Sequence, residues 1–288
     1  VTTQGALTAL GASALTANTT GAYSTALGYN ALAANTTADS NTAVGYVALT
    51  ANTTGTKNVA VGSYALDANT TADRNTALGY EAMTASTTGA NNTAVGSYAL
   101  KTLTTGGDNT AMGDYALGSA TTGSYNTGLG KNAIDNLTTG NNNTAVGRNA
   151  LTTITTTHDG SAFGFEALKA NTTGYNNTGI GCSAITTNTT GSNLTAVGHH
   201  ALRDNTTGDY NTAVGKGALD VNSTGDNNTA VGYDALDANT TADNNTAIGY
   251  LTLSANTTGA GQVAVGANAL KSNTTGTINT AVGHNSLH

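Results

Sequence analysis

The sequence predicts an all-β protein, a parallel β-solenoid in which each turn of the coil stacks on the turn before it. Three observations predict this class: a motif that recurs at every seventeenth position, positions in the motif that are restricted to apolar residues or to Thr, and a composition short of large apolar residues. We expect seventeen turns, one for each repeat, forming a single repeat domain over residues 1–288.

The period is marked by a glycine that follows the tripeptide TAV or a variant of it. This anchor glycine recurs at every seventeenth position without insertion or deletion. A fixed short period is typical of stacked arrays in which each unit covers the apolar face of its neighbour. The anchor glycines are Gly11, Gly28, Gly45, Gly62, Gly79, Gly96, Gly113, Gly130, Gly147, Gly164, Gly181, Gly198, Gly215, Gly232, Gly249, Gly266 and Gly283.

Positions counted from the anchor glycine differ in how much they vary. The residue directly before the anchor is always apolar, as is the residue four after it, and the residue nine after it is always Thr. The residues one and two after the anchor vary freely, as in Tyr46-Val47 and His199-His200. We expect the restricted positions to face neighbouring turns and the variable positions to face water.

Within one repeat, the β-branched segment NTAV predicts a strand over residues 41–46, and residues 48–51 are expected to form a second short extended piece. The segment NTTG at residues 52–55 holds turn-forming residues and predicts a corner. A brief helical turn over residues 46–52 is the alternative for the middle of the repeat. Long helices are disfavoured because Gly, Thr and Asn are poor helix formers.

The spacing of the two apolar positions raises a question of direction. Val44 and Leu49 are five residues apart, so one continuous strand would point them to opposite faces. Either Gly45 makes a corner, or both faces of the strand are covered. Because the chain has few large apolar residues, a second covered face would stabilise it, and we expect several copies to associate side by side as a homo-oligomer.

Composition limits the remaining classes. Only 9% of residues are charged and 5% are aromatic, so a thick apolar core cannot be assembled. The net charge of −7, with nine basic residues, argues against nucleic acid as a partner. No apolar run suits membrane insertion and no signal peptide is visible at the start. We expect a fragment of a longer fibre protein, in which the single cysteine, Cys182, lies at a variable surface position.

Runs that fit NTAVGYxAL and NTAVGxNAL cover nearly the whole chain. They resemble the head repeats of YadA-like trimeric autotransporter adhesins and the repeat regions of phage-type tail fibres. The resemblance implies a left-handed parallel β-roll, packed as a homotrimer and displayed outside the cell, at a cell or virion surface. The adhesin heads generally use a shorter repeat, whereas this chain keeps its longer period throughout.

No catalytic, cofactor or metal site is predicted, and neither is enzymatic activity. His199 and His200 are neighbours, and neighbours on a strand point to opposite faces, so they are not expected to bind one metal ion. Calcium is an alternative because turn carboxylates suit that ion, although the Asp column is filled only in some repeats. Its members are Asp39, Asp73, Asp209, Asp226 and Asp243.

Asn-x-Thr sequons recur at the corner and predict candidate glycosylation sites. Stacked corner amides would explain the same recurrence without sugar, and Leu103, Leu137 and Ile154 replace the Asn in middle repeats. The candidate sites are Asn18, Asn35, Asn52, Asn69, Asn171, Asn188, Asn205, Asn222, Asn239, Asn256 and Asn273.

Exposed aromatic residues form a candidate binding face, because Tyr is amphipathic and stacks on sugar rings of a cell-surface glycan or receptor. The face consists of Tyr29, Tyr46, Tyr80, Tyr64, Tyr98 and Tyr115.

The sequence therefore favours a structural repeat section of an extracellular fibre, of the adhesin-head or tail-fibre kind, acting as a spacer and as a surface for adhesion or glycan attachment. The alternative is an ice-binding β-solenoid that uses stacked Thr rows. The Thr pairs are adjacent, as in Thr53-Thr54, so one of each pair is expected to turn inward and leave single rows.

Overall fold

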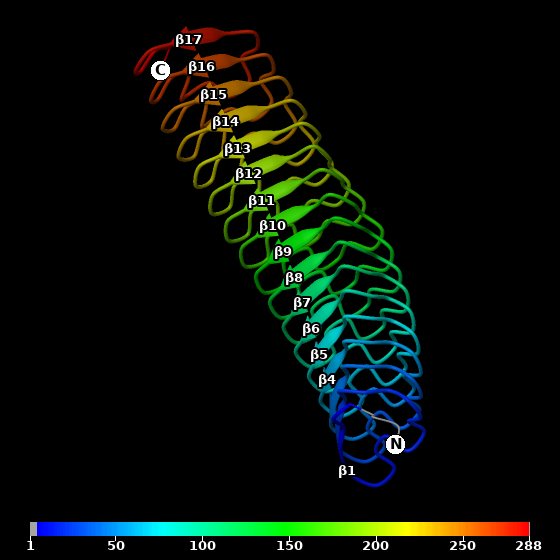
Figure 1. Ribbon diagram of the computed structural model, residues 1–288. Helices are drawn as coiled ribbons and strands as arrows, with labels where there is room; N and C mark the ends of the chain where they lie inside the picture. Colours follow the sequence, from blue (N-terminus) through cyan, green and yellow to red (C-terminus); the bar gives the residue numbers. More distant parts are fainter. Residues whose placement is uncertain (1–4, 288) are drawn as a thin grey trace. The chain divides into compact units, whose positions relative to one another are not determined.

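A computed structural model describes residues 5–287 and confirms the all-β parallel solenoid. The described residues contain 17 strands and no helix, and they form about 16 turns of coil. The chain divides into two compact units, Val1–Asn142 and Asn143–His288, which share this architecture. Figure 1 shows one strand on each turn of the coil.

Every strand is three residues long. The first unit contains β1 (Thr8–Leu10), β2 (Thr25–Leu27), β3 (Thr42–Val44), β4 (Val59–Val61), β5 (Thr76–Leu78), β6 (Thr93–Val95), β7 (Thr110–Met112) and β8 (Thr127–Leu129). The second contains β9 (Thr144–Val146), β10 (Ser161–Phe163), β11 (Thr178–Ile180), β12 (Thr195–Val197), β13 (Thr212–Val214), β14 (Thr229–Val231), β15 (Thr246–Ile248), β16 (Val263–Val265) and β17 (Thr280–Val282).

Within each unit, successive strands pair in parallel, and each residue lies beside its counterpart in the next repeat. In the first unit, Ala26 lies beside Ala43, and in the second, Ala213 lies beside Ala230. Identical side chains therefore stack along the coil at the usual strand spacing of about 4.8 Å. This confirms the expectation that one repeat makes one turn.

The interior of each unit is narrow and is filled by stacked columns of small and medium-sized side chains. In the repeat of β3, these are Ala43, Ala48 and Leu49, all fully buried. Met83 and Ile134 fill the same column as Leu49 in other repeats and are also buried. The prediction that the apolar position four after the anchor glycine faces inward is confirmed away from the ends of the chain.

The apolar residue directly before the anchor glycine behaves differently from the prediction. We expected this restricted position to face a neighbouring turn, but Leu27, Leu78 and Met112 expose 44%, 45% and 46% of their surface. The reason is strand geometry: the middle residue of each strand, which is Ala or, in β8 and β11, Gly, points inward, so the first and third residues point outward.

The anchor glycine makes the corner that lets Ala43 and Leu49 both face inward. Gly45 has a φ of +142°, a backbone conformation that is accessible to Gly. A Cβ added there would lie 2.4 Å from the carbonyl oxygen of Gly62 in the next turn. Conformation and close backbone approach together explain why this position is invariant.

The segment after the corner is neither extended nor helical, so both expectations for residues 46–52 are wrong. It is a series of turns in which Val47 and Leu49 adopt left-handed conformations, with φ of 59° and 51°. Such conformations cost about 1–2 kcal/mol per residue. Bonds between turns of the coil offset this cost: the Val47 amide donates to Tyr29 at 2.8 Å, and the Leu49 amide donates to Ala65 at 3.0 Å.

Candidate functional surfaces

The corner predicted at residues 52–55 is present, and two buried asparagines hold its last carbonyl. Asn52 opens the corner and donates its side-chain amide to the Gly55 oxygen at 2.9 Å. Asn41, which precedes strand β3, donates to the same oxygen at 2.8 Å. We call residues in the position of Asn52 corner asparagines and residues in the position of Asn41 pre-strand asparagines. Both kinds stack, so that Asn52 also donates to Asn35 at 3.0 Å.

The sequon asparagines are these corner asparagines, and the glycosylation interpretation fails for most of them. Nine of the eleven are buried, because their amides point into the coil toward the corner carbonyl. A folded turn leaves no room for a sugar on a side chain enclosed in this way. Asn18 and Asn273 are half-buried and make the same bond, to Gly21 and Gly276. The nine buried residues are Asn35, Asn52, Asn69, Asn171, Asn188, Asn205, Asn222, Asn239 and Asn256.

The aspartates considered for calcium bind main-chain amides instead. Asp39 accepts a hydrogen bond from the Ala22 amide at 2.7 Å, and Asp73 accepts one from the Thr56 amide at 2.6 Å. The same contact, at 2.7 Å, joins Asp209, Asp226 and Asp243 to the preceding turn. Among residues 5–287, no group of three or more His, Cys, Asp or Glu side chains could hold a metal ion.

The two adjacent histidines point the same way, so the expectation that they face opposite sides is wrong. Their rings stack with centroids 3.8 Å apart. His199 and His200 follow the corner at Gly198 and lie in a turn, where the alternation of a strand does not apply. Partial burial and the neighbouring His199 lower the pKa of His200.

The structure brings the six tyrosines of the candidate binding face into two groups of three in the first unit. Tyr29 and Tyr46 stack at 5.3 Å, and Tyr98 and Tyr115 stack at 4.6 Å. The remaining two rings complete the groups by edge contacts, Tyr64 with Tyr46 and Tyr80 with Tyr98. Stacking covers one face of each paired ring, and the edges and hydroxyl groups of these tyrosines also belong to the surface.

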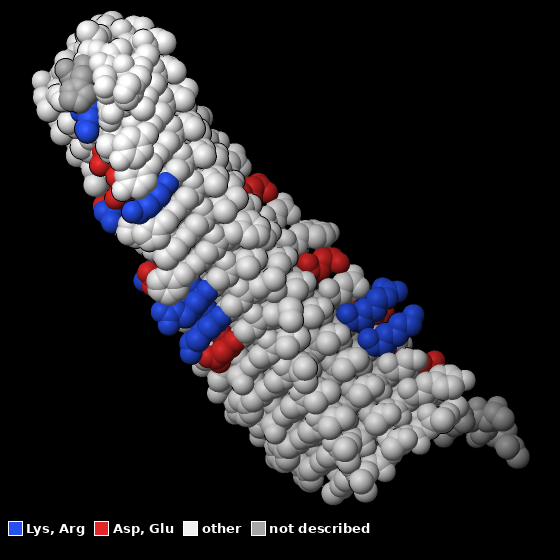
Figure 2. Space-filling model, turned by 90° about the vertical axis from the view of Figure 1, so that its left-hand side faces the viewer, with Lys and Arg blue, Asp and Glu red and all other residues white. Residues whose placement is uncertain are grey.

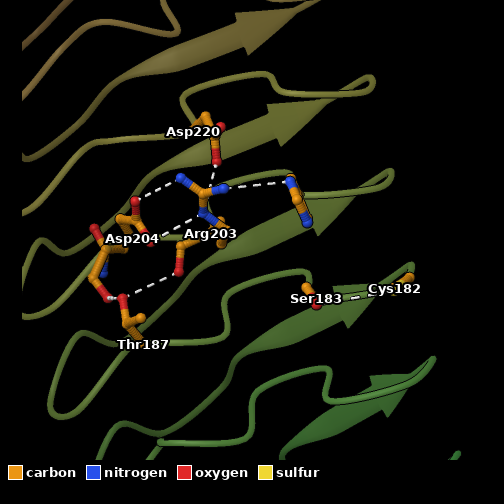
Figure 3. Close-up of polar contacts among 8 residues, drawn as sticks. Cys182, Ser183, Thr187, Arg203, Asp204 and Asp220 are labelled. Carbon is orange, nitrogen blue, oxygen red and sulfur yellow. Dashed lines mark hydrogen bonds and ion pairs between the residues drawn. The ribbon is translucent and has the colours of Figure 1, made fainter.

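A small charged cluster in the second unit was missed by the sequence reasoning. Arg203 forms ion pairs with Asp204 at 2.8 Å and with Asp220 at 3.3 Å (Figure 3). Partial burial raises the pKa of Asp220. In the next turn, burial and the nearby Asp234 raise the pKa of Asp237 to about 6. Asp220 and Asp237 lie five residues after an anchor glycine, at a position whose residue type varies between repeats, so no pattern marked them.

The invariant Thr nine after the anchor glycine was expected to face a neighbouring turn, and one Thr of each pair was expected to turn inward. Both expectations are wrong, because neither Thr of a pair is buried in the described repeats. The first Thr of a pair turns toward the backbone: Thr53 donates its hydroxyl to the Thr70 oxygen at 3.1 Å. The second Thr is exposed in every repeat. This exposed row consists of Thr20, Thr37, Thr54, Thr71, Thr88, Thr105, Thr122, Thr139, Thr156, Thr173, Thr190, Thr207, Thr224, Thr241, Thr258 and Thr275.

Most of the surface is uncharged. Figure 2 shows one face of the molecule, on which the Lys, Arg, Asp and Glu side chains are few and separated by wide uncharged areas. Cys182 is exposed, as expected for a variable position. The described part of the chain contains no helix that could cross a membrane.

Comparisons with protein-family models, with curated protein sequences and with solved structures found no match to this chain.

Proposed function

We propose that this chain is a structural repeat section of an extracellular fibre or filament, of the adhesin-head or tail-fibre kind, and that it acts as a spacer. The observation that carries the proposal is the constant strand register, which joins each repeat to the next by the same set of contacts within each unit. Such an array lengthens by whole repeats without any change in its cross-section.

The hydrogen bonds of one repeat support a load-bearing role. The strand, the left-handed turn and the corner each donate main-chain hydrogen bonds to a neighbouring turn. Thr42 donates to Asn58 at 2.8 Å, Leu49 donates to Ala65 at 3.0 Å, and Thr53 donates to Thr70 at 2.9 Å. A force along the coil would therefore be shared around the whole circumference of each turn.

The fibre role includes association of copies, and a left-handed homotrimer at a cell or virion surface is the form we propose. The tyrosine groups are the proposed attachment surface. They would bind a glycan or receptor through hydroxyl groups, ring edges and ring faces that no neighbouring ring covers. Tyr29, Tyr46 and Tyr80 expose 49%, 46% and 43% of their surface.

Immunogold electron microscopy of the cells or particles that make the protein tests the fibre role. We expect the label on filaments outside the cell or on the virion. Label confined to the cell interior would refute the proposal. Binding of the purified chain to a glycan array, compared with a variant in which Tyr98 and Tyr115 are replaced by Ser, tests the attachment surface.

Ice binding is the second candidate, and the exposed Thr row favours it. This row is the one exposed position that never varies, although Ser replaces Thr elsewhere, at Ser161 in a strand and at Ser223 in a corner. Both the methyl and the hydroxyl group are thus retained at a regular spacing. The strands add a second outward Thr row, but the apolar row beside it ranges from Val44 to Phe163 in size and is uneven.

A thermal-hysteresis assay separates the two candidates. If the exposed Thr row binds ice, the purified chain lowers the freezing point, and replacement of Thr207 and Thr224 by Tyr abolishes the effect. Replacement of the exposed Asn227 and Asn244 by Lys serves as the control and leaves it intact. Absence of thermal hysteresis and of ice-recrystallisation inhibition would remove this candidate.

A further inference from the structure

We propose that copies of this chain associate through the strand face, the surface made by the outward first and third residues of strands β1–β17. The inference rests on the proposed fibre role and deepens it, because it names the surface that joins the copies. The partner is a second copy of the same chain.

The strand face is apolar along one row and carries small, uncharged residues along the other. The first residue of each strand is Thr except at Val59, Ser161 and Val263. The third residue is always apolar: Leu10, Leu27, Val44, Val61, Leu78, Val95, Met112, Leu129, Val146, Phe163, Ile180, Val197, Val214, Val231, Ile248, Val265 and Val282.

The larger residues of the apolar row are exposed to a similar extent away from the ends of the chain. In the second unit, Phe163, Ile180 and Ile248 expose 40%, 41% and 40% of their surface, close to the values of the first unit. This row of apolar residues in successive strands differs from an ordinary protein surface, on which exposed apolar residues are single and scattered. A position that only faces water has no reason to keep an apolar residue in every repeat. A position that is buried against a partner does, because burial of apolar surface stabilises the complex.

The adjacent column widens the same surface. In the second unit, the residue directly after the anchor glycine is aromatic in several repeats, and Phe165, Tyr233 and Tyr250 expose 40%, 41% and 53% of their surface. Aromatic residues are enriched in the buried centres of interfaces between proteins. In these repeats they extend the apolar surface past the glycine corner that ends the strand, whereas the same column holds a charged residue in others, such as Arg148 and Lys216.

The area suffices for stable association. Three residues span about 10 Å across the face, and nine strands at about 4.8 Å give a length of about 40 Å for the second unit, so its strand face covers about 400 Å². The first unit, with eight strands, offers a similar area. If each unit pairs with a unit of another copy, the two pairings together bury about 800 Å² per partner, which is the size of a standard stable interface.

A second copy is the partner that matches this face along its length. The partner must be uncharged and must repeat its side chains at the spacing of one strand, and a copy of the chain does both. Charge supports this choice, since the nine Lys and Arg residues and the 16 Asp and Glu residues all lie outside the strand face. Strand faces of neighbouring copies that meet around a common axis then enclose the apolar rows in a dry seam, with the Thr hydroxyls at its border.

Light scattering coupled to size-exclusion chromatography tests the inference. We expect the purified chain to have a mass that is a multiple of the monomer mass at micromolar concentrations. The triple variant V197K/V214K/V231K places three charges on the strand face of β12–β14 and should be monomeric. The control Y210K/N227K/N244K changes exposed residues of the same repeats, in a column where Lys57 and Arg74 stand naturally, and should keep the native mass.

Circular dichroism shows whether the first variant folds. If it does not, V197T/V214T/V231T keeps the side-chain shape and the branching at Cβ, and we expect it to raise the dissociation constant about tenfold or more. A native chain that is monomeric, or an oligomer that persists in the folded strand-face variant, overturns the inference. If microscopy shows surface filaments but the purified chain is monomeric, association through the strand face is refuted and the fibre role is not. If the chain is an oligomer but is found only inside the cell, the fibre role is refuted and association through the strand face is not.

Discussion

The corner at Gly55 and the corner at Gly106 satisfy the same buried carbonyl in different ways. The Gly55 oxygen accepts two side-chain amides, from the pre-strand Asn41 at 2.8 Å and from the corner Asn52 at 2.9 Å. At Gly106 the corner residue is the buried Leu103, and of the two columns only the pre-strand Asn92 donates, at 3.0 Å.

The two asparagine columns therefore compensate for one another. Where the corner residue is Leu103, Leu137 or Ile154, it cannot donate to the corner carbonyl. In each of these repeats a pre-strand Asn donates to that carbonyl instead. Where the pre-strand residue is Gly160 or Leu194, a corner Asn makes the bond. Either amide suffices because the carbonyl needs one donor once it is removed from water.

The largest effect is expected where a carbonyl has a single amide donor. Replacing Asn92 by Leu removes the donor to Gly106 and also the acceptor of the Asn109 amide, which lies 2.9 Å from the Asn92 side-chain oxygen. Two buried groups lose their partners, so we expect the free energy of unfolding to fall by about 3 kcal/mol. Urea denaturation measures it, and a loss well below 1 kcal/mol would contradict the compensation rule.

A smaller effect is expected where the carbonyl has two donors. Replacing Asn222 by Leu leaves the Gly225 oxygen bonded to Asn211 at 2.7 Å. We expect a loss of about 1.5 kcal/mol, mainly from the broken stack with Asn205. The double variant N211L/N222L should lose more than the sum of the single variants. Simple additivity in this cycle would show that the two amides act independently.

A second donor can also be added. Ser86 stands at the end of the corner stack of the first unit, where its hydroxyl and the side-chain oxygen of Asn69 are both buried without a partner. In S86N, the new amide would bond to Asn69 and to the Gly89 oxygen, and we expect a gain of about 1 kcal/mol in unfolding free energy. Ser86→Ala is the control, and a gain of similar size in that variant would mean that removing the hydroxyl explains the effect.

Asp237 shows what happens to a buried acceptor without a donor. One of its side-chain oxygens has no hydrogen-bond partner, and burial raises its pKa to about 6, so the fold favours the protonated form. This carboxyl therefore stabilises the fold progressively as pH falls from above 6 toward 4, and destabilises it at neutral pH. We expect D237N to gain about 0.5–1 kcal/mol at neutral pH and nothing near pH 4. Thermal unfolding at both pH values measures the difference, and equal gains would refute the role of charge.

The sequence predicted the parts of the fold that depend on the period. The parallel register, the inward column at Leu49 and the corner at residues 52–55 all follow from a strict repeat, because stacked identical turns place identical residues above one another. The direction of Val44 was not predictable in the same way. It depends on where the chain turns, and the φ of Gly45 settles that.

The candidate sites were less accessible to sequence reasoning. The sequon at Asn52 has the same letters whether its amide is exposed for a sugar or buried against Gly55. The Asp39 column resembles a set of calcium ligands until its bond to the Ala22 amide is seen. The Asp39 carboxylate and the Ala22 amide are 17 residues apart and meet only when successive turns stack. The Asn52 amide reaches Gly55 within its own corner, and the closed coil buries it there.

By itself, the sequence determined that the chain forms a β-coil with one repeat per turn, because hydrophobic and turn-forming residues recur at one fixed period. Only the tertiary structure decided which restricted residues face water. A left-handed residue such as Leu49 is unfavourable alone, and contacts with the next turn stabilise it. The outward row that begins with Leu10 is exposed because each strand between two corners is only three residues long. The apolar third residue points away from the coil, so the coil itself does not cover it.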